Sequence, residues 1–536
     1  MRRRDVAELL ALAVVCMVAV GPGSVLPGAP ALGRPTRDLY DHLALLDAWF
    51  THTGDWSYPE GGSLMPPDLF GMVIAAPALA HGMGRVAAYN LSLIVRLWLA
   101  CVAGWLLGRR SGSGLVAGVA FGLSPFLYGE VYTGEAETLS AWPLALMAAL
   151  LESSSAWAWA GAGVVAAVGA VGSWYYGVFL SFYIAIWTIV RLRAGDRRAI
   201  YAGLVFVALV AAPAMFYSQI LAAPDQLFRG PDMADYLQNQ PRALAGMVSD
   251  PAGWFGGMRP GATHEDRLGL VIVGMALLGL LDRDWKGRGW WAAVVFGGLA
   301  LAIGPVLYVG GSEVTSYTPY HLLAQLPLFG LMRLPHRWLL VVSLGLAVLA
   351  ARGAREVPLV AAGLIVAETL LFGVPCTTAI APAPVTDLAG PVLDLPPRTL
   401  GADDARGHYL LWQRTHLRPV PYSLSMSAWS ATLATEPLMI DMAALDSEDR
   451  LAQSPVEAEQ FRQRAFALAV AAEKANPLVA KPVSGARDRL TELGFTDVLL
   501  HLDLLAEGDR ESALAVGIRA LGEPDQKTDE WVRWKL

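Results

Sequence analysis

The sequence predicts an α-helical polytopic membrane domain of about eleven transmembrane helices, followed by a smaller soluble α/β domain. Three observations predict this. The 536 residues are 55% hydrophobic and only 16% charged, whereas soluble globular proteins carry roughly 25% charged residues. The mean hydropathy is +0.44. The apolar residues gather in long runs as far as residue 374, and short basic segments separate these runs.

A membrane helix needs about 20 mostly apolar residues, because the hydrocarbon core of a bilayer is about 30 Å thick. Several of the predicted spans are shorter than this. The predicted spans are residues 6–22, 86–107, 113–128, 137–152, 157–172, 174–191, 199–217, 267–282, 290–308, 337–352 and 357–374.

The basic residues orient these spans, because Lys and Arg concentrate in cytoplasmic loops. If the N-terminus is cytoplasmic, the clusters of basic residues all fall in cytoplasmic segments. An odd number of spans then places residues 375–536 outside. Together with high Ala, Gly and Arg usage, this predicts a multi-pass protein of a bacterial cytoplasmic (inner) membrane with a periplasmic or extracellular C-terminal domain. The clusters are Arg2–Arg4, Arg109–Arg110, Arg191–Arg198, Arg283–Arg288 and Arg352–Arg355.

Two segments could change this topology. Residues 69–83 are apolar but short and contain Pro77, so we expect a helix that lies in the outer interface or dips partway. A full crossing would put Arg109 and Arg110 outside. The first span also resembles a signal peptide with Ala29-Pro30-Ala31 as its cleavage site, but this site is far from the apolar run, so an uncleaved span is favoured.

The predicted domains are therefore residues 1–374, with external loops 23–68, 218–266 and 309–336, and an external tail, residues 375–536. The cytoplasmic loops are only a few residues long, so functional side chains are expected on the external face. In the tail we expect strands at Val392–Leu395, Tyr409–Trp412, Asp497–His501 and Trp531–Trp534, and helices at 455–475 and Arg487–Leu493.

Composition and missing motifs exclude several functions. The net charge is -7 without a long basic run, so nucleic acid is not an expected partner. The three cysteines form no metal-type pair and suggest no disulfide framework. No Walker loop, dinucleotide fingerprint, nucleophile elbow or His-Glu-x-x-His motif occurs, which argues against ATP hydrolysis, cytosolic redox chemistry and metalloprotease activity.

The first external loop contains a cluster of ionisable residues. Asp38, Asp41 and His42 fall within about one helical turn, so they can share one face. Such a group suits general-base work or binding of a divalent metal such as Mg²⁺ or Mn²⁺. The alternative is an ordinary solvated helix start, where Asp is favoured.

A second acidic group lies between the third and fourth spans. Glu130, Glu135 and Glu137 occupy one short segment with no nearby Lys or Arg. Glu135 and Glu137 are candidates to complete the first acidic group. The alternative is that they keep the loop in water.

Cations suited to phosphate lie in two places. Arg96 is in the middle of the second span, where a charge is costly and marks either a functional site or a buried ion pair. Arg333 and Arg337 enter the tenth span on one helical face, with His336 beside them. They could bind a lipid phosphate or anchor the helix at the interface beside Trp338.

The aromatic segment that contains Trp174 and Tyr175 is typical of an interfacial belt. It could also stack on a sugar ring.

These features resemble the GT-C class of polytopic membrane glycosyltransferases, which includes protein O-mannosyltransferases and aminoarabinose transferases. Uncharacterised bacterial members with a C-terminal external domain are the most similar. The likeness spans most of residues 1–370 as order and spacing. It is carried by the acidic first loop, Tyr58–Leu64 with the following apolar run, Tyr89-Asn90, Phe121–Phe126, Trp142–Leu146 and Arg333-x-Pro335-x-Arg337.

The resemblance implies a hexosyltransferase-type enzyme that uses a sugar donor linked to polyprenyl phosphate and an acceptor glycan, lipid or protein. It implies that Asp38, or Asp41 beside it, acts as base or metal ligand, with Glu135 or Glu137 as the second acid. Similar bacterial chains often carry His and Gln in that second loop, which leaves a divalent metal as an open expectation; no other cofactor is implied. The lipid phosphate would meet Arg333 and Arg337, and we assign Arg96 and His336 to the same group.

Two other functions fit the sequence. A transporter or lipid flippase would need several ionisable residues deep in the spans and internal symmetry. The spans contain Arg96 and Glu368, and the sequence shows no internal repeat. A non-catalytic membrane scaffold would use the tail to bind partners and would leave the acidic loops without a chemical task.

Overall fold

The computed structural model describes most of the apolar part of the chain and about half of the tail. The described residues divide into two compact units. The membrane unit comprises Met1–Arg34, Pro66–Ser218 and Pro231–Ala379, and the tail unit comprises Pro35–Met65, Gln219–Gly230 and Ile380–Leu536. The described residues are 3–35, 39–44, 46, 58, 68–222, 254, 267–309, 312–315, 317–323, 335–371, 377–380, 382–397, 405–422, 433, 436–439, 441–442, 485–505 and 507–536.

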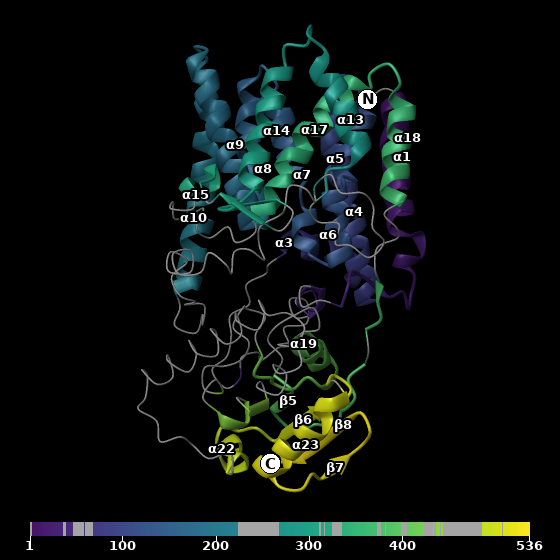
Figure 1. Cartoon of the computed structure of the whole chain (residues 1–536), viewed down its shortest axis with the longest axis vertical. Coiled ribbons are helices and arrows are strands. Elements are labelled where there is room, and N and C mark those ends of the chain that lie inside the picture. Colours follow the sequence, from purple (N-terminus) through teal and green to yellow (C-terminus); the bar gives the residue numbers. More distant parts are fainter. Residues whose placement is uncertain are drawn as a thin grey trace. The chain divides into compact units, whose positions relative to one another are not determined.

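Helices make up most of the membrane unit (Figure 1), and at least one lies in each of the eleven predicted segments. The α-helices are α1 (Arg3–Val20), α3 (Leu69–Ala80), α4 (Arg85–Gly108), α5 (Gly114–Gly122), α6 (Pro125–Thr133), α7 (Trp142–Leu151), α8 (Ala156–Gly172), α9 (Trp174–Arg193), α10 (Ile200–Ala222), α13 (Leu270–Leu281), α14 (Arg288–Ala302), α15 (Pro319–Leu323), α17 (Leu339–Gly353) and α18 (Pro358–Leu371). The 3-10 turns are η1 (Pro22–Val25), η2 (Ala136–Leu139), η3 (Arg197–Ala199) and η5 (Pro335–Trp338).

Two small antiparallel pairs of strands accompany these helices. One pair joins β1 (Ala31–Leu32) to β4 (Thr377–Thr378), and the other is the hairpin of β2 (Leu307–Val309) and β3 (Ser312–Thr315). The side-chain amide of Asn90 in α4 donates to the carbonyls of Ser24 and Pro30 at 2.7 and 2.9 Å. It thereby fixes the segment that leads into β1.

Four helical stretches among the described residues are long and apolar enough to cross a membrane: Arg85–Gly108, Gly114–Thr133, Tyr175–Arg193 and Pro335–Gly353. Among the shorter apolar helices within this part of the chain are α3 and α13. Both have 12 residues, or about 18 Å at 1.5 Å per residue. Length therefore does not separate the expected interfacial helix α3 from the expected span α13, and the count of eleven stays a prediction.

The sequence sets the breaks that shape the functional region. Between α5 and α6, Pro125 removes a backbone donor, and the Ser124 hydroxyl accepts from the Leu127 N–H at 3.4 Å as an N-cap. At the end of α6, Gly134 adopts a left-handed conformation with φ of 84°, which residues with a Cβ avoid. The chain therefore leaves α6 sharply and enters η2, which carries the acidic residues.

Helix α17 is the centre of the membrane unit: its residues 339–351 are all buried, and α5, α13 and α14 pack against it (Figure 1). The approach to α13 is close enough to require glycine. A Cβ on Gly279 would lie 2.0 Å from the Leu349 carbonyl oxygen, and one on Gly353 would lie 2.1 Å from that of Met275. Small residues at such contacts let membrane helices pack through their backbones.

The tail unit contains a four-stranded sheet in the order β5-β6-β8-β7. Strand β5 (Val392–Leu395) is parallel to β6 (Asp497–His501), which is antiparallel to β8 (Trp531–Lys535); β7 (Gln526–Lys527) is the other edge. The helices are α19 (Ala405–His416), α22 (Ala486–Glu492) and α23 (Glu507–Leu521). The sheet and the helices enclose an apolar core that includes Val498 and Trp534.

Most of the tail elements predicted from the sequence are confirmed: the strands at 392–395, 497–501 and 531–534 and the helix at 487–493. The predicted strand Tyr409–Trp412 is wrong, because these residues lie in α19. Every residue from Tyr409 to Gln413 is buried, and a short run that is buried on all sides fits a helix as well as a strand. The predicted helix 455–475 lies outside the described residues.

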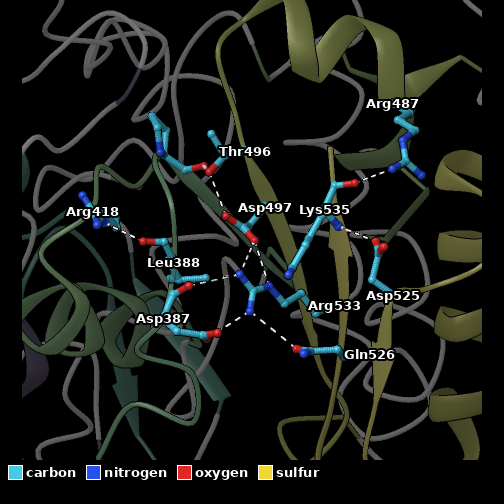
Figure 2. A network of polar contacts seen from close by, with 11 residues as sticks. Asp387, Leu388, Arg418, Arg487, Thr496, Asp497, Asp525, Gln526, Arg533 and Lys535 are labelled. Atoms are coloured by element: carbon cyan, nitrogen blue, oxygen red, sulfur yellow. Dashed lines mark hydrogen bonds and ion pairs between the residues drawn. The ribbon is translucent and has the colours of Figure 1, made fainter.

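A buried arginine joins the two central strands of the tail (Figure 2). Arg533 of β8 pairs with Asp497 of β6 at 2.7 Å and with Asp387 at 3.0 Å. The Thr496 hydroxyl donates to the second oxygen of Asp497 at 2.7 Å. Because both oxygens of Asp497 are engaged, the buried charges are paired and their desolvation is offset.

A second polar cluster lies at the carboxyl ends of β5 and β6. His501 is 2.8 Å from the carboxylate of Asp394. The backbone N–H of Arg418 donates to Nδ1 of His416, the last residue of α19, at 3.1 Å. Burial lowers the pKa of His416, as do the charges of Arg418 and His501, while Asp394 opposes them. The folded tail therefore favours a neutral His416.

We expect Gly279→Val to destabilise the protein by about 1–3 kcal/mol, the usual cost of overpacking. Gly274→Val is the matched control on the same helix, because a Cβ there meets nothing within 4 Å. Thermal unfolding of the purified full-length chain in detergent measures both. Equal melting temperatures for the two variants would contradict the close packing of α13 on α17.

We expect the tail to lose stability as the pH falls below 6.5, the ordinary pKa of histidine. The unfolded chain takes up a proton there that the folded His416 accepts only at lower pH, so acid favours unfolding. Unfolding followed by tryptophan fluorescence at about pH 7.5 and 5.5 should show this loss, and His416→Gln should reduce it. An unchanged pH dependence in that variant would contradict the assignment.

Candidate functional site

The candidate site is the turn η2 together with the arginine that binds it. Nη2 of Arg337 contacts Oε2 of Glu135 and lies 3.3 Å from Oε1 of Glu137. The Arg337 side chain is only 5% exposed, whereas those of Glu135 and Glu137 are 18% and 20% exposed. The cation is thus buried while both carboxylates keep access to solvent.

The other sides of Arg337 differ from the one that meets the acids. Its guanidinium lies over the ring of Tyr175 in α9, 4.2 Å from the ring centroid, as a cation–π contact. Its Nε has no hydrogen-bond partner among the described residues, and the same is true of Nε2 of His336, which precedes it in η5. Two adjacent residues therefore hold buried nitrogens with unused hydrogen-bonding capacity.

Arg96 donates to the backbone of the turn η2 and is completely buried. Its Nη1 bonds to Asp68 at 2.6 Å and to the Ala136 carbonyl at 2.5 Å, and its other nitrogens bond to Ser92. The second oxygen of Asp68 caps α3 by accepting from the Gly71 N–H at 3.0 Å. Arg96 thereby ties the start of α3 to the peptide between Glu135 and Glu137.

The buried ion pair with a carboxylate, one of the two alternatives for Arg96, is present, and every nitrogen of the guanidinium has a partner. Arg96 thus holds the acidic turn in position. Direct phosphate binding by Arg96 stays a prediction.

Tyr176 gives the turn a second support. Its hydroxyl donates to the Thr138 carbonyl, and its ring is fully buried. Arg96 and Tyr176 thus fix the backbone on both sides of Glu137. Because neither contact uses a carboxylate, the acids stay available to Arg337 and to a ligand.

The remaining predicted residues lie elsewhere or are not described. Asp41 and His42 are buried in the tail unit, beside Tyr40, whose ring is 4.4 Å from that of His408. Asp38, Arg333 and the side chain of Trp174 lie outside the described residues. A joint site of the first-loop acids with Glu135 and Glu137 stays a prediction.

The donor set in the described part of the chain does not fit a metal ion. No three His, Cys, Asp or Glu side chains come together there in a way that could hold one, and Glu135 and Glu137 are both turned to Arg337. A divalent metal at Asp38 and Asp41 stays a prediction, because Asp38 lies outside the described residues.

Sequence reasoning missed Asp68 and Tyr176. Asp68 directly precedes the apolar run 69–83, which is the pattern of an N-cap, and this signal could have located it. No comparable pattern marks Tyr176, because its partner Thr138 is far away along the chain. The aromatic interpretation of this segment was also incomplete, since the ring face of Tyr175 meets Arg337.

We expect Arg96→Met to cost about 3–5 kcal/mol, because it removes one partner of a buried ion pair and leaves the charge of Asp68 without that cation. Asp68→Asn in the same chain should recover part of the loss, which a double-mutant cycle measures by thermal unfolding. Arg197→Met, which removes an exposed arginine, is the control. Additive effects of the two substitutions would contradict the coupling.

Comparison with known proteins gives structural likeness only: no protein-family model matches the chain, and no curated protein matches its sequence. The oligosaccharyltransferase of Archaeoglobus fulgidus, solved with a tethered acceptor peptide, is 10% identical with a TM-score of 0.42, over 97% of this chain and 71% of that one. ArnT of Cupriavidus metallidurans, bound to undecaprenyl phosphate, is 12% identical with a TM-score of 0.38, over 99% and 98%. At these scores no residue role transfers from either protein. Both are GT-C glycosyltransferases, the class that the sequence resembles.

Proposed function

We propose that this chain is a membrane glycosyltransferase that moves a sugar from a polyprenyl-phosphate-linked donor to an acceptor on the external face of the cytoplasmic membrane. The observation that carries the proposal is the buried Arg337 between two partly exposed carboxylates. Glycosyl transfer from a lipid phosphate needs a cation for the departing phosphate and a base for the acceptor. This cluster supplies both within one turn.

The phosphate side of the reaction belongs to Arg337 and His336. As the bond from the anomeric carbon to the phosphate oxygen breaks, its electron pair stays with the lipid phosphate, whose negative charge grows. The fixed guanidinium stabilises that charge in a buried setting, where electrostatic interactions are stronger than in water. The unpartnered Nε–H of Arg337 is a further donor for the phosphate, and Nε2 of His336 is another in the tautomer that carries the proton there.

The acceptor side belongs to the carboxylates. The acceptor hydroxyl attacks the anomeric carbon, and its proton passes to a carboxylate within hydrogen-bond reach. Glu135 and Glu137 are the candidates, because they remain partly exposed while Arg96 and Tyr176 hold their backbone. Asp38 and Asp41 of the first loop are proposed as an additional acidic group at the acceptor.

We expect Glu135→Gln combined with Glu137→Gln to reduce sugar transfer by about 100-fold or more, the usual contribution of general acid–base catalysis. The assay follows label from a polyprenyl-phosphate-linked sugar in membrane vesicles that contain the full chain. Glu356→Gln, at an exposed acid paired only with its neighbour Arg355, should leave transfer unchanged. Unaltered transfer by a folded double variant would refute the role of the acids. No transfer by the wild-type chain from any such donor would favour a flippase or scaffold.

The external placement has its own test. Alkaline phosphatase fused after Leu536 should be active, because that enzyme matures only outside the cytoplasm and the tail is proposed to lie there. A green fluorescent protein fused at the same position should stay dark on export through the general secretory route. A bright fusion with inactive phosphatase would show a cytoplasmic tail and contradict the proposed topology.

A further inference from the structure

The ion pairs of Arg337 are distributed unevenly over the nitrogens of its guanidinium. Both carboxylates approach the same nitrogen, Nη2. That nitrogen carries two N–H groups, so the two acids use its full donor capacity. Nε of Arg337 meanwhile has no hydrogen-bond partner within the described part of the chain. The acids therefore occupy one corner of the guanidinium and leave the other nitrogens to a ligand.

The geometry of a guanidinium makes Nη2 necessary for bidentate binding of a phosphate. Arginine binds phosphate most strongly through two parallel N–H···O bonds. One such edge pairs Nε with Nη2, and the other pairs Nη1 with Nη2. Both edges include Nη2. A phosphate that binds Arg337 in the bidentate manner must therefore take one N–H of Nη2 from Glu135 or Glu137.

The residues around Arg337 restrict its movement, so the guanidinium cannot bind a phosphate and both carboxylates in separate positions. Its side chain is buried, and the ring of Tyr175 covers one face of the guanidinium. The acids cannot retreat by moving their backbone, because Arg96 and Tyr176 hold it at Ala136 and Thr138. Their side chains are partly exposed and can rotate away from Arg337.

We propose that the donor's lipid phosphate and the carboxylates of Glu135 and Glu137 compete for Nη2 of Arg337, so that donor binding releases a carboxylate to serve as base. This rests on the proposed function and adds an order to it: the donor binds first, and the base becomes available to the acceptor afterwards. Without a donor, the arginine holds the acids in an ion pair and keeps them from acting as a base.

The proposal makes a prediction opposite to that for an ordinary binding residue. Glu135→Gln removes a charged competitor, so the full-length variant should bind undecaprenyl phosphate roughly 5-fold more tightly or better, the lower range of typical coupling between linked sites. The same variant should lose transfer. Glu137→Gln should change binding in the same direction, and it serves as the test if Glu135→Gln does not fold. Glu356→Gln is the control for removal of a negative charge.

Binding is measured on protein in nanodiscs, with undecaprenol as the probe that lacks the phosphate. Affinity for undecaprenyl phosphate that is unchanged or weaker in both acid variants overturns the competition, even if transfer is lost. Arg337→Gln separates this failure from a failure of the proposed function. If Arg337→Gln binds the phosphate as well as the wild type, the phosphate role of Arg337 is wrong and the competition falls with it.

Discussion

The buried guanidinium of Arg96 is the constraint on which the proposed site depends. Three helical elements meet at it: its own helix α4, the helix α3 through its cap Asp68, and the turn η2 through Ala136. A charge buried in this way must keep all its partners, because losing one leaves an uncompensated group. The position of the acidic turn is therefore fixed by the electrostatics of a neighbouring ion pair, and Glu135 and Glu137 are left to interact with Arg337.

The two arginines are chemically alike and have different tasks because their surroundings differ. Arg96 has a partner at every nitrogen and is closed to solvent. Arg337 concentrates its ion pairs on one nitrogen, lies against an aromatic ring and keeps unused donor capacity. The first arrangement favours rigidity and the second allows exchange of partners. A site that must bind and release a phosphate needs both, since exchange at Arg337 is productive only if the acids stay in place.

The parts of the structure that depend on local sequence could be predicted. Apolar runs give the helices, the strand at Val392–Leu395 is a short, mostly apolar run that ends before Pro396-Pro397, and Glu135, Glu137 and Arg337 are each candidates by residue type. Their association could not be predicted, because Arg337 and Glu135 are 202 residues apart along the chain and only the packing of α17 brings them together. The same holds for Arg96 and Asp68, 28 residues apart. Tyr409–Trp412 shows the opposite failure, since a short aromatic run fits a strand or a buried helix equally well until its neighbours are known.

The account as a whole stands on Arg337 acting on the leaving phosphate, and one measurement tests this most directly. Purified full-length chain in proteoliposomes is mixed with a labelled polyprenyl-phosphate sugar as the sole donor, and release of the lipid phosphate is followed through a single turnover. Arg337→Lys keeps the charge but cannot bind the phosphate in the bidentate manner of a guanidinium, so this variant should release the phosphate far more slowly than the wild type. Arg337→Gln should release it more slowly still. Equal rates in the wild type and in folded Arg337→Gln would contradict the account.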